Sequence, residues 1–255
     1  MTAGPVVYNI WFILGVFISN GIGCVLSVFC LVRMTDARRS FANRAFLVLA
    51  AAWGIVETAR DDALFVIATA IHLRDDSVVF YLAPSLALTV VSIGLACAVL
   101  GVAAANPRPV WTVTAGATVG LLTGGMAVQA VLAGRSGYAV SIDVPAAVAT
   151  AAGLAAVTAA AVFLATGATA RWRMTGPILV LALCMTVAQY LLAAEVNTDL
   201  SAVEDNAIGM SPLQLIFICV AAFGVRTIVL TLLSITDEGK FERAAEYAGT
   251  RRAPD

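Results

Sequence analysis

Seven long apolar segments follow one another along this chain, and short connections between them hold most of its charged residues. Each segment has about 20 residues or more, which is the length an α-helix needs to cross the hydrocarbon core of a bilayer. The segments are expected at Val6–Val32, Ala45–His72, Ser85–Ala105, Trp111–Ala133, Ala146–Thr166, Gly176–Ala194 and Pro212–Ile235. We therefore predict an all-α polytopic membrane protein, with a seven-helix transmembrane domain over residues 1–235 and a short tail over residues 236–255.

The composition agrees with a membrane protein. Apolar residues make up 61% of the chain and charged residues 12%, whereas soluble domains have about 25% charged residues. No basic, aromatic-rich soluble surface is present for nucleic acid, and no phosphate loop, nucleophile elbow or zinc-protease motif occurs. We expect a protein that is not an enzyme and holds no cofactor, whose first partner is the lipid bilayer.

The connections differ strongly in charge, which predicts the orientation of the chain. Of the 15 Lys and Arg residues, 11 fall on one side of the segments and only Arg74 and Arg135 on the other. Basic residues gather in cytoplasmic connections, so the N-terminus is expected outside and the C-terminus in the cytoplasm. The eleven are Arg33, Arg38, Arg39, Arg44, Arg108, Arg171, Arg173, Lys240, Arg243, Arg251 and Arg252. Abundant arginine and alanine indicate a GC-rich bacterial genome, and hence the bacterial inner membrane.

The outer connections show an internal repeat. Each ends at a proline that opens the next segment, Pro84, Pro145 and Pro212, and proline is well tolerated in the first turn of a helix. The approaches to the first two are alike, Val-Val-Phe-Tyr-Leu-Ala-Pro at 78–84 and Ala-Val-Ser-Ile-Asp-Val-Pro at 139–145. The chain is thus expected to form three helical hairpins, over about residues 6–72, 85–133 and 146–194, followed by a final helix over 212–235.

With these motifs the chain resembles the MHYT family of bacterial membrane sensors. Gly-Leu-Leu-Thr-Gly-Gly-Met-Ala-Val-Gln-Ala-Val-Leu-Ala at 120–133 stands where the family has a helix ending in Met-His-Tyr-Thr-Gly-Met-Ala-Ala, and Cys-Met-Thr-Val-Ala-Gln-Tyr-Leu-Leu-Ala-Ala at 184–194 occupies the third repeat. The resemblance implies three hairpins, an outside N-terminus and a last helix that leads to cytoplasmic output.

The chain departs from the family at its metal site, which the resemblance implies would hold copper on histidines and methionines. The histidine positions here read Ala127 and Ala188, and the first repeat offers only Leu64–Val66. The single histidine, His72, cannot rebuild a three-part site, so we predict no metal. Soft sulfur ligands for Cu(I) would have to converge from Met126, Cys184 and Met185.

The candidate ligand-binding residues are the charges inside the predicted helices, namely Glu57, Arg60, Asp61 and Asp62 of the second segment and Arg226 of the seventh. Charges at such depth cost several kcal/mol each, about 3 kcal/mol on insertion scales, unless they are paired or hydrated, and they mark functional sites. One hypothesis is a polar pocket for a small ligand, ion or proton. A second is a salt-bridge clamp between the two helices, and a third places the four residues in a re-entrant break of the second segment.

These features favour a stand-alone sensory, regulatory or accessory protein that acts through a membrane protein partner or complex. A small-solute or proton-linked transporter that uses the buried charges is the first alternative, and a structural or assembly subunit of a larger membrane complex is the second. A continuous polar path across the bundle would favour transport, and a dead-end pocket would favour sensing. The absence of a pocket, with apolar small-residue helix faces exposed, would favour a subunit.

Overall fold

The computed structural model describes most of the chain, and at several element ends it describes the backbone alone. The described residues are 9–34, 41–72, 79–80, 82–106, 108–135, 139–167, 175–194, 196–199 and 209–250.

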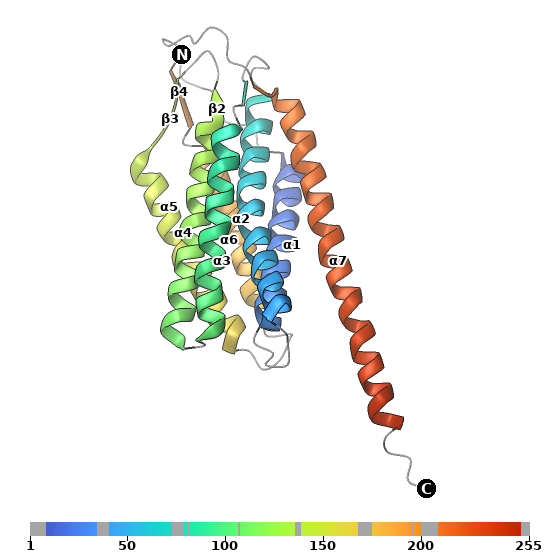
Figure 1. Ribbon diagram of the computed structural model, residues 1–255. Coiled ribbons are helices and arrows are strands. Elements are labelled where there is room, and N and C mark those ends of the chain that lie inside the picture. The colour runs from blue at the N-terminus through green and yellow to red at the C-terminus, as the bar shows by residue number, and fades with distance from the viewer. Residues whose placement is uncertain are drawn as a thin grey trace.

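Seven α-helices form a bundle in which consecutive helices run in opposite directions (Figure 1). The predicted all-helical fold class is therefore confirmed. The helices are α1 (Ile10–Met34), α2 (Phe41–His72), α3 (Ala83–Ala105), α4 (Pro109–Ala133), α5 (Val144–Gly167), α6 (Thr175–Ala194) and α7 (Pro212–Thr250).

Six of these helices are long and apolar enough to cross a membrane. They are α1 and α3–α7, and large apolar side chains cover much of their outward surfaces, for example Val90, Leu179 and Phe217. Because lipid tails are the natural environment for such surfaces, the chain is a multi-pass membrane protein. Helix α2 has the length to cross as well, but its apolar sequence is interrupted by Glu57, Arg60, Asp61 and Asp62.

The charged helix α2 lies in the middle of the bundle. It packs against α1, α3, α4, α6 and α7, and nearly all of its side chains between Ala50 and Thr69 are buried or half-buried. Helix α2 is continuous from Phe41 to His72, so the re-entrant break considered from the sequence is wrong. Its charges are placed within a protein interior, where other side chains rather than lipid can neutralise them.

Two short antiparallel ribbons join the α2–α3, α4–α5 and α6–α7 connections, an addition to the all-helical prediction. Strand β1 (Val79–Phe80) pairs with β2 (Gly134–Arg135), and β3 (Ala139–Ile142) pairs with β4 (Val196–Asp199). All four strands lie at the same end of the bundle, called here the strand end (Figure 1). Beyond the helix termini the backbone N–H and C=O groups lose their helical partners, and strand pairing satisfies them.

The core divides into two apolar clusters, one above the other along the bundle. The strand-end core contains Phe80, Leu64, Leu192 and Leu215. The opposite-end core contains residues such as Leu31, Leu47, Leu100 and Leu181.

Helices α4 and α5 make the most extensive helix contact, and glycine makes it possible. A Cβ atom placed on Gly116, Gly120 or Gly124 would come within 2.7 Å of a backbone atom of α5, opposite Ala159, Ala155 and Ala151 respectively. Small residues one turn apart allow such close backbone approach in membranes. Gly120 and Gly124 therefore serve packing within the chain. A Cβ atom placed on Gly125 would meet no atom within 4 Å.

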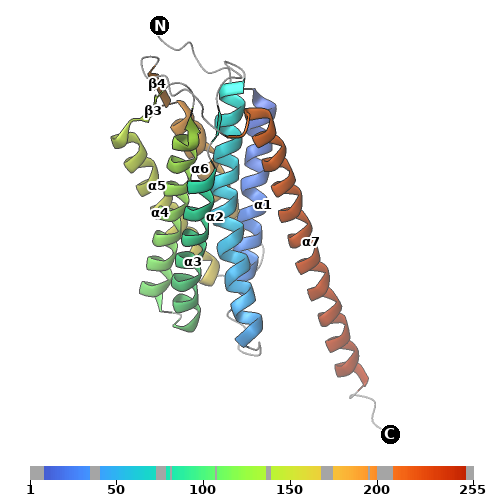
Figure 2. The same cartoon turned by 45° about the horizontal axis from the view of Figure 1, so that its top comes forward.

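Helix α7 stands apart from the rest at its C-terminal end. Figures 1 and 2 both show its strand-end half against the bundle and its other half leaning away. The sequence predicts the end of this helix at Ile235, but the helix continues to Thr250. No proline interrupts residues 213–250.

Candidate functional site

A layer of polar side chains separates the two apolar cores, and it contains all five residues singled out from the sequence. We call it the polar layer; its members are Ser19, Asn20, Glu57, Arg60, Asp61, Asp62, Thr89, Gln189 and Arg226. The sequence of each helix explains the layering. On α1 the polar pair falls between Val16 of the strand-end core and Cys24 of the opposite-end core, and on α2 Asp61 falls between Ala63 and Ala59 of the same two cores.

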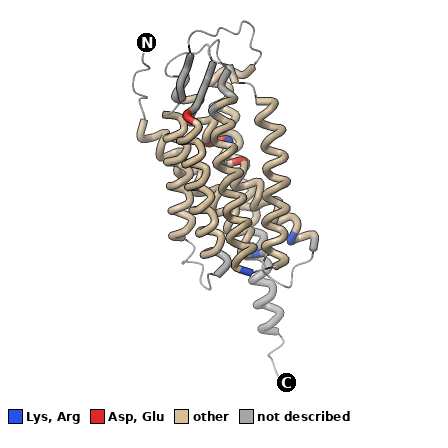
Figure 3. Tube along the Cα trace, turned by 90° about the vertical axis from the view of Figure 1, so that its left-hand side faces the viewer, with Lys and Arg blue, Asp and Glu red and all other residues tan. Residues whose placement is uncertain are grey.

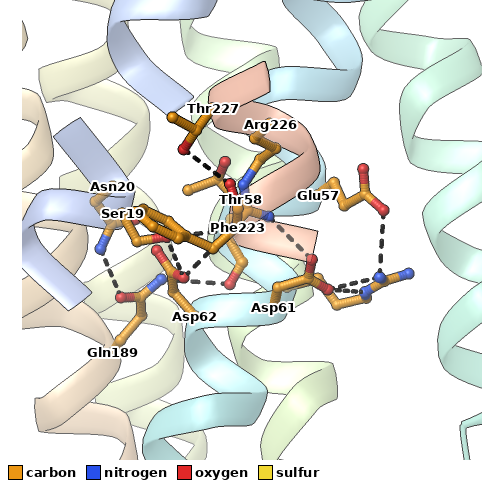
Figure 4. Close-up of polar contacts among 12 residues, drawn as sticks. Ser19, Asn20, Glu57, Thr58, Asp61, Asp62, Gln189, Phe223, Arg226 and Thr227 are labelled. Carbon is orange, nitrogen blue, oxygen red and sulfur yellow. Dashed lines mark hydrogen bonds and ion pairs between the residues drawn. The ribbon is translucent and has the colours of Figure 1, made fainter. Parts of the chain in front are cut away.

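Arg226 is the largest fully buried side chain among the described residues, with an exposed fraction of 0%. Its Nη1 donates a hydrogen bond of 2.9 Å to Oδ2 of Asp61 on α2. A guanidinium buried in this way needs both a counter-charge and hydrogen-bond acceptors. This contact joins the outlying helix α7 to the central helix of the bundle (Figure 4).

Ser19 of α1 connects the second nitrogen of Arg226 to Asp62. Its hydroxyl accepts a hydrogen bond of 3.1 Å from Nη2 of Arg226 and donates one of 2.7 Å to Oδ1 of Asp62. The same Nη2 lies 3.6 Å from Oδ1 of Asp62. A single hydroxyl thus links α1, α2 and α7.

Arg60 lies on the other side of Asp61, toward α3. Its Nε and Nη2 both bond to Oδ1 of Asp61, at 2.9 and 2.6 Å, and its Nη1 donates to the Thr89 hydroxyl at 3.3 Å. Glu57, three residues earlier on α2, lies 3.6 Å from Nη2 of Arg60. The side chain of Glu57 keeps 21% exposure, while the Asp61 side chain keeps 3%.

The uncharged part of the layer ties α1 to α6. The amide nitrogen of Asn20 donates to the Thr186 hydroxyl at 3.0 Å and to Oε1 of Gln189 at 2.9 Å. The amide nitrogen of Gln189 donates in turn to the backbone carbonyl of Ala59 at 3.3 Å. Four helices, α1, α2, α6 and α7, therefore meet around Ser19 and Asn20 (Figure 4).

Several buried polar atoms in the layer have no hydrogen-bond partner among the described residues. They are Oδ2 of Asp62, Oε2 of Glu57, Oδ1 of Asn20 and Nε of Arg226. Buried polar atoms elsewhere in the bundle are in the same situation, for example Oγ of Ser85 and Oε1 of Gln129. Ordered water is the usual partner of such groups in proteins.

The apolar cores on either side limit what the layer can do. Within the described residues, polar side chains that bond to one another cluster in the layer, and the cores above and below are lined by aliphatic residues, alanine, Phe80 and sulfur side chains. Buried hydroxyls outside the layer, such as Ser27, Ser92 and Thr123, are single polar groups within these cores. Figure 3 shows acidic and basic positions close together in the strand-end half, and a separate group of basic positions toward the opposite end.

The sulfur residues considered for copper make separate contacts. The thiol of Cys24 lies 3.7 Å from the sulfur of Met185, and the Ser92 hydroxyl lies 3.5 Å from the sulfur of Met126. In the described part of the chain, no group of three or more His, Cys, Asp or Glu residues is placed to hold a metal ion. The side chain of His72 lies outside the described residues.

Sequence reasoning found the charged members of the layer and missed its uncharged members. The pairing of Arg60 with Glu57 and the meeting of Asp61 with a residue of another helix follow from spacing and charge. Ser19, Asn20 and Gln189 sit in the interior of otherwise apolar helices. Their position could have identified them as site residues from the sequence, because a polar side chain in the middle of a membrane span faces a protein interior.

Comparison with known proteins adds no assignment. No protein-family model matches the chain, and neither a curated protein nor a solved structure matches it significantly.

Proposed function

We propose that this protein is a membrane-embedded sensory or regulatory protein, in which the polar layer is the sensing site and α7 is the output element. The observation that carries the proposal is the position of Arg226. Arg226 is buried in the layer, yet it belongs to α7, the 39-residue helix that leans away from the bundle toward Thr250. A change at the layer therefore acts first on α7.

The geometry of α7 supports this coupling. Described contacts join it to α2, to α1 and to the strand end, where Met210, just before the helix, exchanges two backbone hydrogen bonds with Phe80. Further along, Val225, Ile228 and Leu232 are exposed, while Val229, Leu230 and Leu233 are half-buried. Apolar side chains of α7 also pack against both cores, Leu215 and Cys219 at the strand end and Val229, Leu230 and Leu233 at the opposite end. The ion pair of Arg226 lies between these two apolar contacts, so breaking it changes the middle of the α7 interface.

We further propose that all seven helices cross a bacterial inner membrane, with the strand end outside and α7 leading to the cytoplasm. The excess of Lys and Arg at the opposite end supports this orientation. The ribbons support the hairpin repeat, since β1 and β2 flank α3–α4, and β3 and β4 flank α5–α6. The relationship to MHYT sensors remains part of this proposal, with a site of charged residues in place of metal ligands and at other positions than Leu64–Val66, Ala127 and Ala188.

A sensor of this kind, with no catalytic motif in its sequence, needs a membrane protein partner to transmit its state. The alternative with an observation in its favour is a proton-linked carrier, since carboxylate oxygens in the layer lack partners. The direct contact of Arg226 on α7 with Asp61 on α2, which couples the layer to the proposed output helix, favours sensing over transport.

The test is whether the layer controls what α7 binds. A tagged protein at native level, purified in mild detergent, is expected to recover one membrane partner in constant ratio. Arg226→Gln should lower that recovery several-fold while the protein still folds. Thr231→Ala, an exposed change on the same helix, is the matched control and should leave recovery unchanged. Equal recovery with both variants would contradict the proposed coupling.

A further inference from the structure

The polar layer contains one more acid than base. Glu57, Asp61 and Asp62 face Arg60 and Arg226, so three carboxylates meet two guanidinium groups and leave one negative charge. Within the described part of the chain no further Lys or Arg pairs with these acids. An uncompensated charge at membrane depth costs several kcal/mol, about 3 kcal/mol on insertion scales, and a proton removes that cost.

The two guanidinium groups are not shared equally among the acids. Both bind Asp61, one at each carboxylate oxygen, at 2.6–2.9 Å. Glu57 and Asp62 are each left with a single contact of 3.6 Å to a guanidinium nitrogen. Asp61 is therefore the ionised partner of both arginines, and the excess charge falls on one of the other two acids.

Burial and contact geometry select Asp62 over Glu57. The Asp62 side chain keeps 7% exposure against 21% for Glu57, so water solvates a charge on Asp62 less than a charge on Glu57. Every described contact of Asp62, from Ser19 and from Arg226, is made to Oδ1. Its Oδ2 is buried without a partner among the described residues, so a proton can sit there without disturbing any contact.

The surroundings of Asp62 hold few other groups that could accept or repel a proton. Helix α2 brings Glu57, Arg60 and Asp61, and α7 brings Arg226. The thiols of Cys24 on α1 and Cys219 on α7 lie within electrostatic range. Helix α6 approaches with the uncharged Gln189 and has no Asp, Glu, Lys, Arg or His.

We propose that the polar layer is a proton-binding site, in which Oδ2 of Asp62 carries one exchangeable proton that brings the layer to electrical neutrality. At alkaline pH a hydroxide ion takes the proton of Asp62 and becomes water, while the electrons of the broken O–H bond remain on Oδ2. The released carboxylate then competes with Asp61 for Arg226, which it already approaches to 3.6 Å. This inference names the species sensed and so rests on the proposed function, but the charge count stands without it.

The experiment is infrared difference spectroscopy on the purified full chain in lipid nanodiscs, titrated from acid to alkaline pH. A protonated carboxylic acid has a C=O stretch that shifts in D₂O. We expect such a band near neutral pH, its loss at alkaline pH, and its absence in Asp62→Asn. The band should persist in Thr231→Ala, the matched control, because that residue is exposed and lies outside the polar layer. Glu57→Gln should weaken the band, since two carboxylates then face two guanidinium groups.

A second measurement does not depend on the variants folding. In the wild-type chain, aspartate labelled with ¹³C in its carboxyl group should shift the band, and glutamate labelled in the same way should not. A shift with labelled glutamate, or persistence of the band in Asp62→Asn, would overturn the assignment. A band that disappears on adding Na⁺ at fixed pH would show a metal cation site and overturn it as well.

The infrared result for Asp62 and the partner recovery test the proton site and the sensory role separately. An Asp62 proton without any effect on partner recovery would leave the proton site intact and remove the sensing role. A partner lost in Arg226→Gln without an Asp62 band would do the reverse.

Discussion

Arg226 and Asp61 are 165 positions apart in the chain, and the guanidinium of one bonds to the carboxylate of the other at 2.9 Å with almost no exposure of either side chain. Asp61 also accepts hydrogen bonds from Nε and Nη2 of Arg60. The carboxylate therefore stands between two cations, one from its own helix and one from α7. The contact between Arg226 and Asp61 ties α7 to one acid of the central helix.

Removing one partner of this pair should be far more damaging than removing both. Arg226→Gln or Asp61→Asn leaves a buried charge with fewer partners, and breaking a buried pair in this way costs about 3–5 kcal/mol. The double variant should recover part of that loss. The free energy of unfolding in mixed micelles, measured for the four proteins of the cycle, gives the coupling energy. Additive effects within about 0.5 kcal/mol would contradict a direct interaction.

The glycine contact between α4 and α5 should tolerate no side chain at its centre. A Cβ on Gly120 would lie 2.5 Å from the carbonyl oxygen of Leu154, and rigid backbone cannot yield as a side chain does. Gly120→Ala should lower the free energy of unfolding by about 1–3 kcal/mol. Gly125→Ala, one turn away with nothing within 4 Å, should be neutral or stabilising by up to about 1 kcal/mol. Equal effects would contradict the packing.

The hydrogen bonds of Asn20 should contribute modestly to stability. Asn20→Ala removes the two donors that reach Thr186 and Gln189 on α6. Hydrogen bonds between membrane helices contribute about 0.6 kcal/mol each on average, so we expect a loss of about 1 kcal/mol. Thr118→Ala, whose hydroxyl bonds within its own helix to the carbonyl of Thr114, is the control and should change the unfolding free energy little. A larger effect for the control would argue against the α1–α6 link.

The orientation of the bundle can be read from chemical labelling. Asp143 at the strand end and Arg108 at the opposite end are both exposed. In intact cells, Asp143→Cys should react with a membrane-impermeant maleimide, while Arg108→Cys should react only after permeabilisation. The unmodified chain controls for its five own cysteines, which all lie within helices. The reverse pattern would place the strand end in the cytoplasm.

Sequence predicted the helices well because apolar length is a local property. All seven expected segments are helical over most of their length, and the need of Arg226 for an acid on α2 followed from charge alone. Which acid it meets, and through which hydroxyl, depends on the rotation of α1 and α7 against α2, and a single sequence does not encode that in any local pattern. Ser19 and Gln189 became visible as site residues only once the helices were packed.

The ribbons and the end of α7 escaped prediction for different reasons. Strands of two to four residues, such as β1 and β3, carry too few positions for an alternating pattern. The helix beyond Ile235 was taken for a tail because its charged residues mark the end of an apolar span, although nothing in them stops a helix. Hydropathy therefore predicted where the span ends and not where the helix ends.

The central claim is that the polar layer holds α7 against the bundle, and a distance measurement tests it most directly. Spin labels on genetically encoded ketone residues at Leu49 of α2 and Leu232 of α7, both exposed, leave the native cysteines in place. In nanodiscs we expect one narrow distance distribution for the otherwise unchanged protein, and a longer and broader one after Arg226→Gln. A distribution that stays the same in Arg226→Gln would contradict the account.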